Sequence, residues 1–475
     1  MLRPNKTVFV SGNFFIIHPG HVRFLRFASE CGNRLIVGVH ATQPSVGFPA
    51  PHERCEVLLS LGFVDEVVIL NDGLEKALCR LKPDIVVKGK EYERVNNPEE
   101  ALLKHWSGSL LFSSGDSTYS ATELLGSSFR RGIEWVPPRD YMRRHGIELD
   151  RSRGILDSFS DLSVIVIGDL IVDEYVLCEA LGMSREDPTV VVSPQHTDRF
   201  LGGAGIVAAH AARLGASTKF LSVAGADDVG EWAKHRLDDF GVDAMIVGDD
   251  SRPTTLKQRY RVGSKTMLRV SHLRQHEVSK SVADRLKAAI FPLLSTTKLL
   301  VFADFNYGCL PQELVDSLIS SARESGVTVV ADSQSSSQLG NISRFRHADL
   351  LTPTEHEARL ALRAQSESLP VLGSELLDRA FAKRAFITLG EAGVMVFDRS
   401  LDGPPLQVDQ LPALNRNPVD VAGAGDSMLI AASMALASGS DGFEAAYIGS
   451  VASAIQTSRV GNIPISMAEI REALH

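Results

Sequence analysis

The 475-residue sequence is poor in cysteine, in positive charge and in long apolar runs, and each lack excludes a class of protein. Its five cysteines are odd in number, lie far apart and form no Cys-x-x-Cys pair, so they indicate neither a disulfide framework nor a zinc site. We expect isolated thiols in a reducing compartment. Lysine and arginine (49) are outnumbered by aspartate and glutamate (58), which gives a formal net charge of −9. This balance argues against nucleic acid as a partner.

No stretch of the sequence approaches the ~20 consecutive apolar residues that a membrane-spanning helix needs. The early apolar stretch from Val8 to Ile17 is interrupted by Ser11-Gly12-Asn13 and lacks a small-residue cleavage site. We therefore expect no signal peptide, no membrane segment and a cytoplasmic location. With 44% apolar and 23% charged residues, a chain of this length is expected to form two or three globular domains.

Short β-branched runs alternate with helical patterns in the first part of the chain. Apolar residues at Val22, Leu25, Ala28 and Cys31 share one helix face, and this helix lies between two strand patterns. A strand–helix–strand order implies parallel strands, so the sequence predicts a Rossmann-like α/β domain over residues 1–135. Its strands are expected at Thr7–Ser11, Arg34–Val39, Glu66–Leu70, Asp84–Lys88 and Ser109–Phe112.

The alternation fails in a charged, turn-rich stretch that predicts an inter-domain linker over residues 136–160. It resumes in a second, larger α/β domain, expected over residues 161–475. Two β-rich segments, Thr189–Ser193 and Thr254–Val262, are expected to form a small β lid on this domain. The main-sheet strands are expected at Ser163–Gly168, Lys298–Phe302, Val327–Ala331, Asp349–Thr352 and Ala385–Leu389.

The most informative stretch of the sequence runs from Asp420 to Asp426. Within it Gly423, Ala424 and Gly425 are small residues at the start of a predicted helix. A helix N-terminus offers unpaired N–H groups to an anion, and glycines let a phosphate approach the backbone closely. A carboxylate in the first turn can then accept the proton of an attacking hydroxyl. Taken alone, the stretch also fits a glycine-permitted loop with an ordinary N-terminal helix charge.

Four further motifs precede this stretch in a defined order. They are Gly168-Asp169 with Asp173, Leu201-Gly202-Gly203-Ala-Gly205, Thr352-Pro-Thr-Glu-His-Glu357 and Thr388-Leu-Gly390-Glu-Ala-Gly393. Together the five motifs resemble the ribokinase (PfkB) family of sugar kinases from about Ser163 to the C-terminus. The resemblance implies a ribokinase-like fold, dependence on ATP and Mg²⁺, and a homodimer formed through the kinase domain.

The resemblance also implies a role for each motif. Asp426 would be the catalytic base, with Gly423, Ala424 and Gly425 as the phosphate-binding turn. The nucleotide would be bound by Thr388, Gly390 and Gly393, the sugar by Asp173, Gly202 and Gly203, and magnesium, through water, by Glu357.

Within this family, Gly168–Tyr175, Ser184–Pro188 and the strands around Lys257 resemble one group of enzymes. That group is the bifunctional heptose 7-phosphate kinase and heptose 1-phosphate nucleotidyltransferase of ADP-heptose synthesis. Lys257, Arg259 and Arg269 would then bind an anionic substrate, because a phosphate attracts convergent cations. The alternative is that these three are solvated charges on exposed strands.

Several positions depart from the family pattern. The family asparagines are replaced by Ile206 and Thr354, and a family threonine by Ala422. Two family lysines are replaced by Tyr307 and Gln334. The catalytic base and the anion-binding turn match the family pattern, whereas residues that bind the sugar in the family are replaced. The sequence therefore predicts a kinase more firmly than it predicts the sugar.

In the N-terminal domain His18-Pro-Gly-His21 lies between the first predicted strand and the first helix, where α/β sheets bind ligands. Two imidazoles there can stabilise charge on an α-phosphate and on leaving pyrophosphate. The tetrapeptide alone also fits a turn with two incidental histidines. Around it, residues 5–130 resemble the cytidylyltransferase-like nucleotidyltransferases. The motifs are Ser11-Gly12-Asn13-Phe14, His52-Glu-Arg54, Lys82-Pro-Asp-Ile-Val-Val-Lys88-Gly89 and Tyr119-Ser120-Ala-Thr122-Glu-Leu-Leu125.

This second resemblance makes His18 and His21 catalytic. The implied nucleotide-binding residues are Gly12, Asn13, Phe14, Lys88, Ser120 and Thr122, and the nucleotide is ATP, CTP or another NTP. Phe15 stands where the family usually has aspartate, and residues 40–51 lack a lysine that commonly meets the triphosphate. Lys88 is the candidate substitute.

The leading interpretation is a bifunctional sugar-activating enzyme. A kinase would phosphorylate a sugar or heptose-phosphate-like substrate, and a nucleotidyltransferase would convert a sugar 1-phosphate and an NTP into an NDP-sugar and pyrophosphate. The domain order would be inverted relative to the enzymes of ADP-heptose synthesis. The alternative is an active sugar kinase with a catalytically weak, nucleotide-binding regulatory N-terminal domain. A third hypothesis is that both domains are degenerate and serve as an interaction protein. The intact glycine-rich and histidine motifs argue against it.

Overall fold

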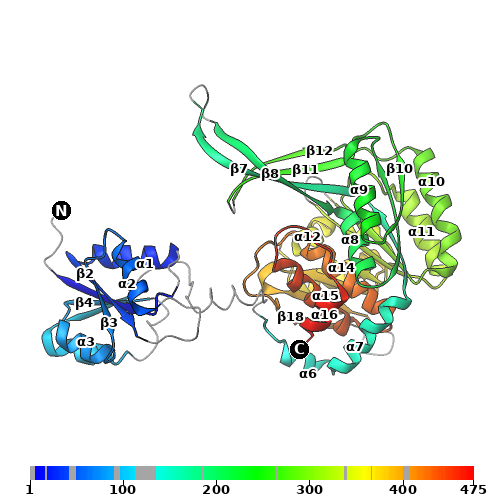
Figure 1. The fold of residues 1–475 in the computed structure, drawn as a ribbon. Coiled ribbons are helices and arrows are strands. Elements are labelled where there is room, and N and C mark those ends of the chain that lie inside the picture. The colour runs from blue at the N-terminus through cyan, green and yellow to red at the C-terminus, as the bar shows by residue number, and fades with distance from the viewer. Residues whose placement is uncertain are drawn as a thin grey trace. The chain divides into compact units, whose positions relative to one another are not determined.

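A computed structural model of the chain divides into two compact units, Met1–Gly132 and Ile133–His475 (Figure 1). No helix among the described residues combines the length and the apolar character needed to cross a bilayer. The structure describes residues 6–15, 19–41, 50–89, 97–112, 135–184, 187, 189–263, 265–335, 340–364, 366–399 and 406–474.

The first unit is built on a five-stranded parallel sheet with the order β3-β2-β1-β4-β5. In β1, Val8 and Val10 pack into the core on one face and Phe9 into the core on the other, so the central strand is buried on both sides. The predicted Rossmann-like fold is thus confirmed. The strands are β1 (Thr7–Gly12), β2 (Arg34–His40), β3 (Glu66–Leu70), β4 (Ile85–Lys88) and β5 (Ser109–Phe112). The helices are α1 (Pro19–Glu30), α2 (Pro51–Leu59), α3 (Leu74–Leu81), α4 (Glu99–Leu103) and the 3₁₀ turn η2 (Lys104–Trp106).

The second unit contains a nine-stranded sheet with the order β10-β9-β6-β13-β14-β15-β16-β17-β18. It is parallel from β10 to β16, and the pairings of β16 with β17 and of β17 with β18 are antiparallel. The core strands are β6 (Ser163–Gly168), β9 (Ser217–Ala224), β10 (Asp243–Gly248), β13 (Leu299–Asp304), β14 (Thr328–Ser333), β15 (Leu350–Leu351), β16 (Arg384–Thr388), β17 (Val394–Asp398) and β18 (Gln407–Leu411).

Helices cover both faces of this sheet, and a hydrophobic core lies on each side. Val164 and Val166 of β6 belong to one core, whereas Ile165 and Ile167 belong to the other. The helices are α8 (Gly203–Arg213), α9 (Asp228–Asp239), α10 (Lys280–Ile290), α11 (Gln312–Glu324), α12 (Glu355–Leu362), α13 (Leu369–Ala380), α14 (Ala424–Ala437), α15 (Gly442–Thr457) and α16 (Met467–Ala473). The 3₁₀ turns are η4 (Phe291–Thr296), η5 (Ile342–Arg344) and η6 (Gly390–Ala392).

A separate four-stranded sheet, with the order β12-β11-β7-β8, forms the lid that projects from the core sheet in Figure 1. The lid strands are β7 (Leu170–Met183), β8 (Val190–Gly202), β11 (Thr255–Val262) and β12 (Lys265–His272). The sequence predicted a lid but underestimated the number and the length of its strands. The outer part of β7 is exposed after Cys178, so no buried face imposes an apolar pattern there.

Residues 136–160, expected as a linker, belong instead to the second unit. They form α6 (Arg139–Arg144) and α7 (Leu149–Asp157), followed by η3 (Ser158–Asp161). Tyr141, Leu156 and Phe159 are buried in the core, and the Tyr141 hydroxyl donates to the Phe443 carbonyl at 3.1 Å. The linker prediction is wrong here because two short, charge-rich helices need only a few large anchors to dock, and so few anchors give a weak periodic pattern.

Candidate functional site

The start of α14 forms the centre of the candidate kinase site. Gly423 is the N-cap residue with φ of 76°, and a Cβ there would lie 2.3 Å from Asn462 Oδ1. Glycine is therefore required by both the backbone and the neighbouring side chain. Asp420 fixes the turn, since its carboxylate accepts the N–H groups of Ala422 and Gly461 at 3.1 Å each. The first-turn N–H groups of α14 have no partner within the helix and can bind an anion.

Asp426 lies in this first turn and is buried. Burial, with a further contribution from the Asp173 carboxylate, raises the pKa of Asp426 to about 7, although the Lys257 ammonium opposes the shift. The Gln334 amide is 3.5 Å from Asp426 Oδ1, at the long limit of a hydrogen bond. A carboxyl group with this pKa can exchange a proton with a substrate near neutral pH.

The lid brings the predicted substrate residues to the same place. Asp173 is buried on β7 and lies in register with Lys257 on β11. Arg259 Nη2 approaches Asp173 Oδ1 at 3.3 Å, and a Cβ at Gly202 would lie 2.4 Å from Asp173 Oδ2. Burial raises the pKa of Asp173, while Arg259 and Lys257 oppose the shift. The Asp173 carboxylate and the Lys257 ammonium are thus close enough to Asp426 to shift its pKa, and Arg259 lies against Asp173.

The remaining predicted substrate residues are placed less centrally. Arg269 on β12 is exposed and lies opposite Arg259 in the antiparallel register. Gly203 opens α8 with φ of 57°, and a Cβ there would lie 2.4 Å from the Asp169 carbonyl. Ile206, which stands at a family asparagine position, is fully buried in the core and contributes packing instead.

The predicted nucleotide residues form a turn beside the start of α12. Thr388 ends β16, forms a bridge with Thr354 and donates its N–H to the Pro353 carbonyl at 2.9 Å. Gly390 has φ of 60°. Gly393 has φ of 92°, and a Cβ there would lie 2.1 Å from the Leu411 carbonyl oxygen. These backbone conformations explain why the turn carries glycines.

The Glu357 carboxylate accepts several hydrogen bonds at the start of α12. Its Oε2 accepts the N–H and the hydroxyl of Thr354 at 2.8 Å each, and its Oε1 accepts the Ser335 N–H at 2.8 Å. This capping box fixes the turn that faces Asp332. Within the described ranges no group of three or more His, Cys, Asp or Glu residues is placed to hold a metal ion.

Asp332 is a buried carboxylate of the site whose role the sequence motifs did not predict. Burial raises the pKa of Asp332 well above its usual value, and the Glu357 and Asp426 carboxylates raise it further. The Thr352 hydroxyl donates to Asp332 Oδ1 at 3.2 Å. Its position at the carboxyl end of β14 was the available signal, because ligands bind at that edge of a parallel sheet.

In the first unit the structure places some of the predicted residues and not others. His18, Ser120 and Thr122 lie outside the described residues. Gly12 ends β1, and the ring of Phe14 lies 5.3 Å from that of His21 in an edge-on arrangement. A Cβ at Gly12 would lie 3.0 Å from the Phe14 ring. Phe14, which follows β1, is therefore packed against the start of α1.

Arg54 is a buried residue that also lacked an assigned role. Its guanidinium donates to the carbonyls of Asn13 and His40 at 2.5 and 3.1 Å, and lies 4.7 Å from the centre of the Phe15 ring. Arg54 thus joins the carboxyl ends of β1 and β2. The sequence contained the motif around Arg54, but only the fold shows which carbonyls it holds.

Lys88, the candidate triphosphate lysine, is paired within its own unit. Its Nζ lies 3.0 Å from Glu99 Oε1 and 2.9 Å from Asn97 Oδ1. The Lys88 and Glu99 side chains are only 18% and 9% exposed. A buried carboxylate therefore neutralises the lysine charge locally.

This arrangement defines an α/β enzyme with two nucleotide-binding folds. The sequence profile described as pfkB family carbohydrate kinase matches residues 161–468, and the cytidylyltransferase-like profile matches residues 9–108. The chain belongs to the pfkB family of carbohydrate kinases, with a cytidylyltransferase-like domain before the kinase.

Named relatives and solved structures agree with this assignment. The chain is 31% identical to the "Bifunctional protein HldE" of Bradyrhizobium sp. strain ORS 278 over 66% of its length, and 30% identical to that of Helicobacter hepaticus over 66%. The matches span 65% and 64% of those relatives. Escherichia coli phosphofructokinase-2 with substrates and products superposes with a TM-score of 0.54 at 18% identity, covering 66% of this chain and 98% of its own. Thermotoga maritima ribokinase gives 0.51 at 19%, covering 66% and 99%. These structures establish the ribokinase-like fold.

Proposed function

We propose that the chain is a bifunctional sugar-activating enzyme, in which the kinase unit phosphorylates a sugar or sugar phosphate with ATP. The observation that carries the proposal is Asp426, a buried carboxylate with a pKa near 7 in the first turn of α14. Asp426 would accept the proton of the acceptor hydroxyl as that oxygen bonds to the γ-phosphorus. The bond from the γ-phosphorus to the bridging oxygen would break, and ADP would leave. The helix N-terminus would stabilise the transferring charge.

The acceptor is proposed to be anionic and similar to a heptose phosphate. Lys257 and Arg259 lie on the lid face that carries Asp173, and both oppose the rise in its pKa. Asp173 suits sugar hydroxyls, while the two cations suit a phosphate. The family resemblance and the bifunctional relatives support this substrate class.

The N-terminal unit is proposed to transfer a nucleotidyl group from ATP, CTP or another NTP to a sugar 1-phosphate. The sugar-phosphate oxygen would attack the α-phosphorus, and pyrophosphate would leave. His18 and His21 are the proposed stabilisers of this charge. Placing this unit first would invert the domain order of the enzymes of ADP-heptose synthesis. Magnesium as the metal, a cytoplasmic location and a homodimer formed through the lid complete the proposal.

A second function for the N-terminal unit is supported by one observation. The Lys88 ammonium is neutralised by Glu99. This pairing weakens the attraction of Lys88 for a triphosphate and favours a regulatory, nucleotide-binding unit attached to an active kinase.

One assay separates these functions. Purified protein is incubated with ATP, CTP, heptose phosphates and other sugars, and ADP and pyrophosphate are measured separately. We expect ADP from the wild-type protein and ADP formation at least about a hundredfold slower from Asp426→Asn. Pyrophosphate that disappears in His21→Ala supports nucleotidyl transfer. Nucleotide binding without pyrophosphate supports the regulatory function, whereas unchanged ADP formation by Asp426→Asn refutes the assigned base.

A further inference from the structure

Asp169 occupies the connection between the core sheet and the lid. It is the residue that separates the last residue of β6, Gly168, from the first residue of β7, Leu170. β6 is a central strand of the core sheet, and β7 is a central strand of the lid. The side chain is only 4% exposed. A conformational change at Asp169 would therefore alter the angle between the lid and the core.

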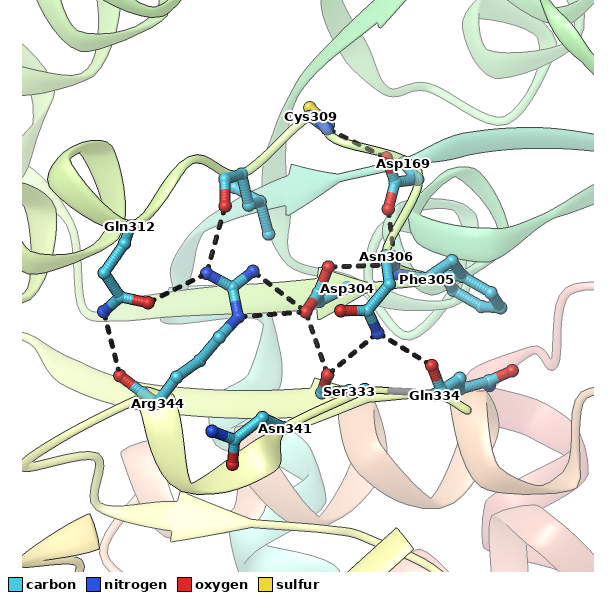
Figure 2. A network of polar contacts seen from close by, with 12 residues as sticks. Asp169, Asp304, Phe305, Asn306, Cys309, Gln312, Ser333, Gln334, Asn341 and Arg344 are labelled. Atoms are coloured by element: carbon cyan, nitrogen blue, oxygen red, sulfur yellow. Dashed lines mark hydrogen bonds and ion pairs between the residues drawn. The ribbon is translucent and has the colours of Figure 1, made fainter. Parts of the chain in front are cut away.

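The Asp169 carboxylate binds the backbone of the loop that follows β13 (Figure 2). Its Oδ2 accepts the N–H groups of Phe305 at 2.8 Å and Tyr307 at 3.2 Å, and its Oδ1 accepts the Cys309 N–H at 3.1 Å. Burial and the nearby Asp304 raise the pKa of Asp169 to about 6, while these three bonds oppose the shift. At pH 8 the group is therefore an anion held by three donors from one loop.

The rest of this loop, Phe305–Cys309, is held by core groups. The Asn306 amide donates to the Gln334 carbonyl at 2.8 Å and to the Ser333 hydroxyl at 3.2 Å (Figure 2). Arg252 donates to the Tyr307 carbonyl at 2.8 Å. Asp304, at the end of β13, is paired with Arg344 at 2.9 Å. The Phe305–Cys309 loop is consequently a rigid platform on the core. Asp169 connects this platform to the hinge, by which we mean the junction of β6 and β7.

The platform supports a cation of the lid. The Lys257 ammonium on β11 lies 5.4 Å from the ring centre of Phe305 and 5.1 Å from that of Tyr307. The two rings also pack with Ile171 of β7 in a small apolar cluster. Lys257 is the cation that opposes the raised pKa of Asp426. The position of Lys257 beside the base thus depends on where these two rings lie.

We propose that Asp169 is a positioning residue of the kinase site. By fixing the Phe305–Cys309 loop against the hinge, it holds the Phe305 and Tyr307 rings under Lys257 and keeps the lid cation beside Asp426. Asp169 touches none of the reacting groups, and its effect passes through Lys257. The proposal rests on the kinase function proposed above.

The variant that tests this is Asp169→Asn, which preserves the size of the side chain and removes its charge. We expect the acceptor kcat/KM at pH 8 to fall on the order of tenfold or more, because small misplacements of a site group have large kinetic effects. The KM for ATP should change little, and amide exchange at Phe305, Tyr307 and Cys309 should accelerate. Asp349→Asn is the matched control, since Asp349 accepts the Val329 N–H at 2.8 Å elsewhere in the core sheet. The control should keep the acceptor kcat/KM of the wild-type protein.

A double-mutant cycle distinguishes positioning from general destabilisation. In a Lys257→Met background, Asp169→Asn should lower the acceptor kcat/KM by less than about threefold, because the residue through which Asp169 acts is absent. Multiplicative effects of the two substitutions, or wild-type acceptor kinetics in Asp169→Asn, would overturn the proposal.

A readout that needs no kinase activity keeps this test separate from that of the proposed function. Acetylation of Lys257 by acetic anhydride, followed by mass spectrometry, should be faster in Asp169→Asn than in the wild-type protein. If the wild-type protein phosphorylates no sugar, the proposed function fails while the labelling still decides the role of Asp169. Equal labelling rates would refute it.

Discussion

The ammonium of Lys88 lies 3.0 Å from the Glu99 carboxylate, and both side chains are largely buried. A substrate triphosphate must compete with this carboxylate for the lysine. We therefore expect Glu99→Gln to bind ATP or CTP several-fold more tightly than the wild-type protein, on the order of 1 kcal/mol. Isothermal titration calorimetry measures this affinity directly. The same substitution should lower the melting temperature, since it removes the carboxylate that neutralises a largely buried cation.

Glu100→Gln is the control for this prediction. Glu100 pairs with Lys104 at 3.5 Å, but both side chains are exposed and the pair contributes little. Glu100→Gln should measurably change neither the affinity for the nucleotide nor the melting temperature. Unchanged or weaker nucleotide binding by a folded Glu99→Gln protein would show that Lys88 does not meet the triphosphate.

The pH dependence of the kinase reaction should report Asp426. Its pKa of about 7 means that the carboxylate form, which accepts the proton, is lost as the pH falls through 7. We expect kcat/KM to fall about tenfold per pH unit below that value and to level off above it. Asp426→Asn should be at least about a hundredfold slower, with this limb absent. A profile that stays flat between pH 5.5 and 8 would exclude Asp426 as the titrating base.

The two glycines at the start of α14 should respond differently to alanine. At Gly423 both the φ of 76° and the 2.3 Å approach to Asn462 Oδ1 oppose a side chain. Gly423→Ala should therefore destabilise the protein by about 1–3 kcal/mol in chemical denaturation and impair phosphoryl transfer. At Gly425 a Cβ would meet no heavy atom within 4 Å. Gly425→Ala should keep or slightly raise stability, while its methyl group hinders a bound phosphate. Equal stability losses in both variants would contradict this account.

The core strands could be predicted because the sheet buries them on both faces. β6 and β13 carry consecutive apolar residues, and such runs bounded by turns are typical of parallel strands. The lid strand β12 could not be predicted in this way. It is almost wholly exposed, so its sequence shows no alternation between a buried and a solvated face.

The residues of the candidate site also divide into those that the sequence reveals and those that it does not. The sequence singled out Asp426, Asp173 and Lys257 through motifs, and the fold places them around one another. Asp169 and Arg54 lie in motifs as well, but their roles depend on backbone groups far along the chain. The N–H groups that Asp169 accepts belong to Phe305–Cys309, and no local spacing relates them. Contacts of this kind follow from topology, so the sequence pattern alone does not reveal them.

The exposed apolar side chains of the lid predict how the protein associates. Leu181 and Met183 on β7 are 63% and 60% exposed, and Val190 on β8, which is paired with Met183, is 49% exposed. Large apolar residues gathered on one small sheet commonly mark a protein interface. We expect sedimentation velocity to show a dimer that dissociates on Leu181→Asp, with an unchanged melting profile at low protein concentration. Val371→Asp is the control, because Val371 is 45% exposed on α13 and lies outside the lid. A wild-type monomer, or a Leu181→Asp dimer of unchanged affinity, would exclude the lid as the interface.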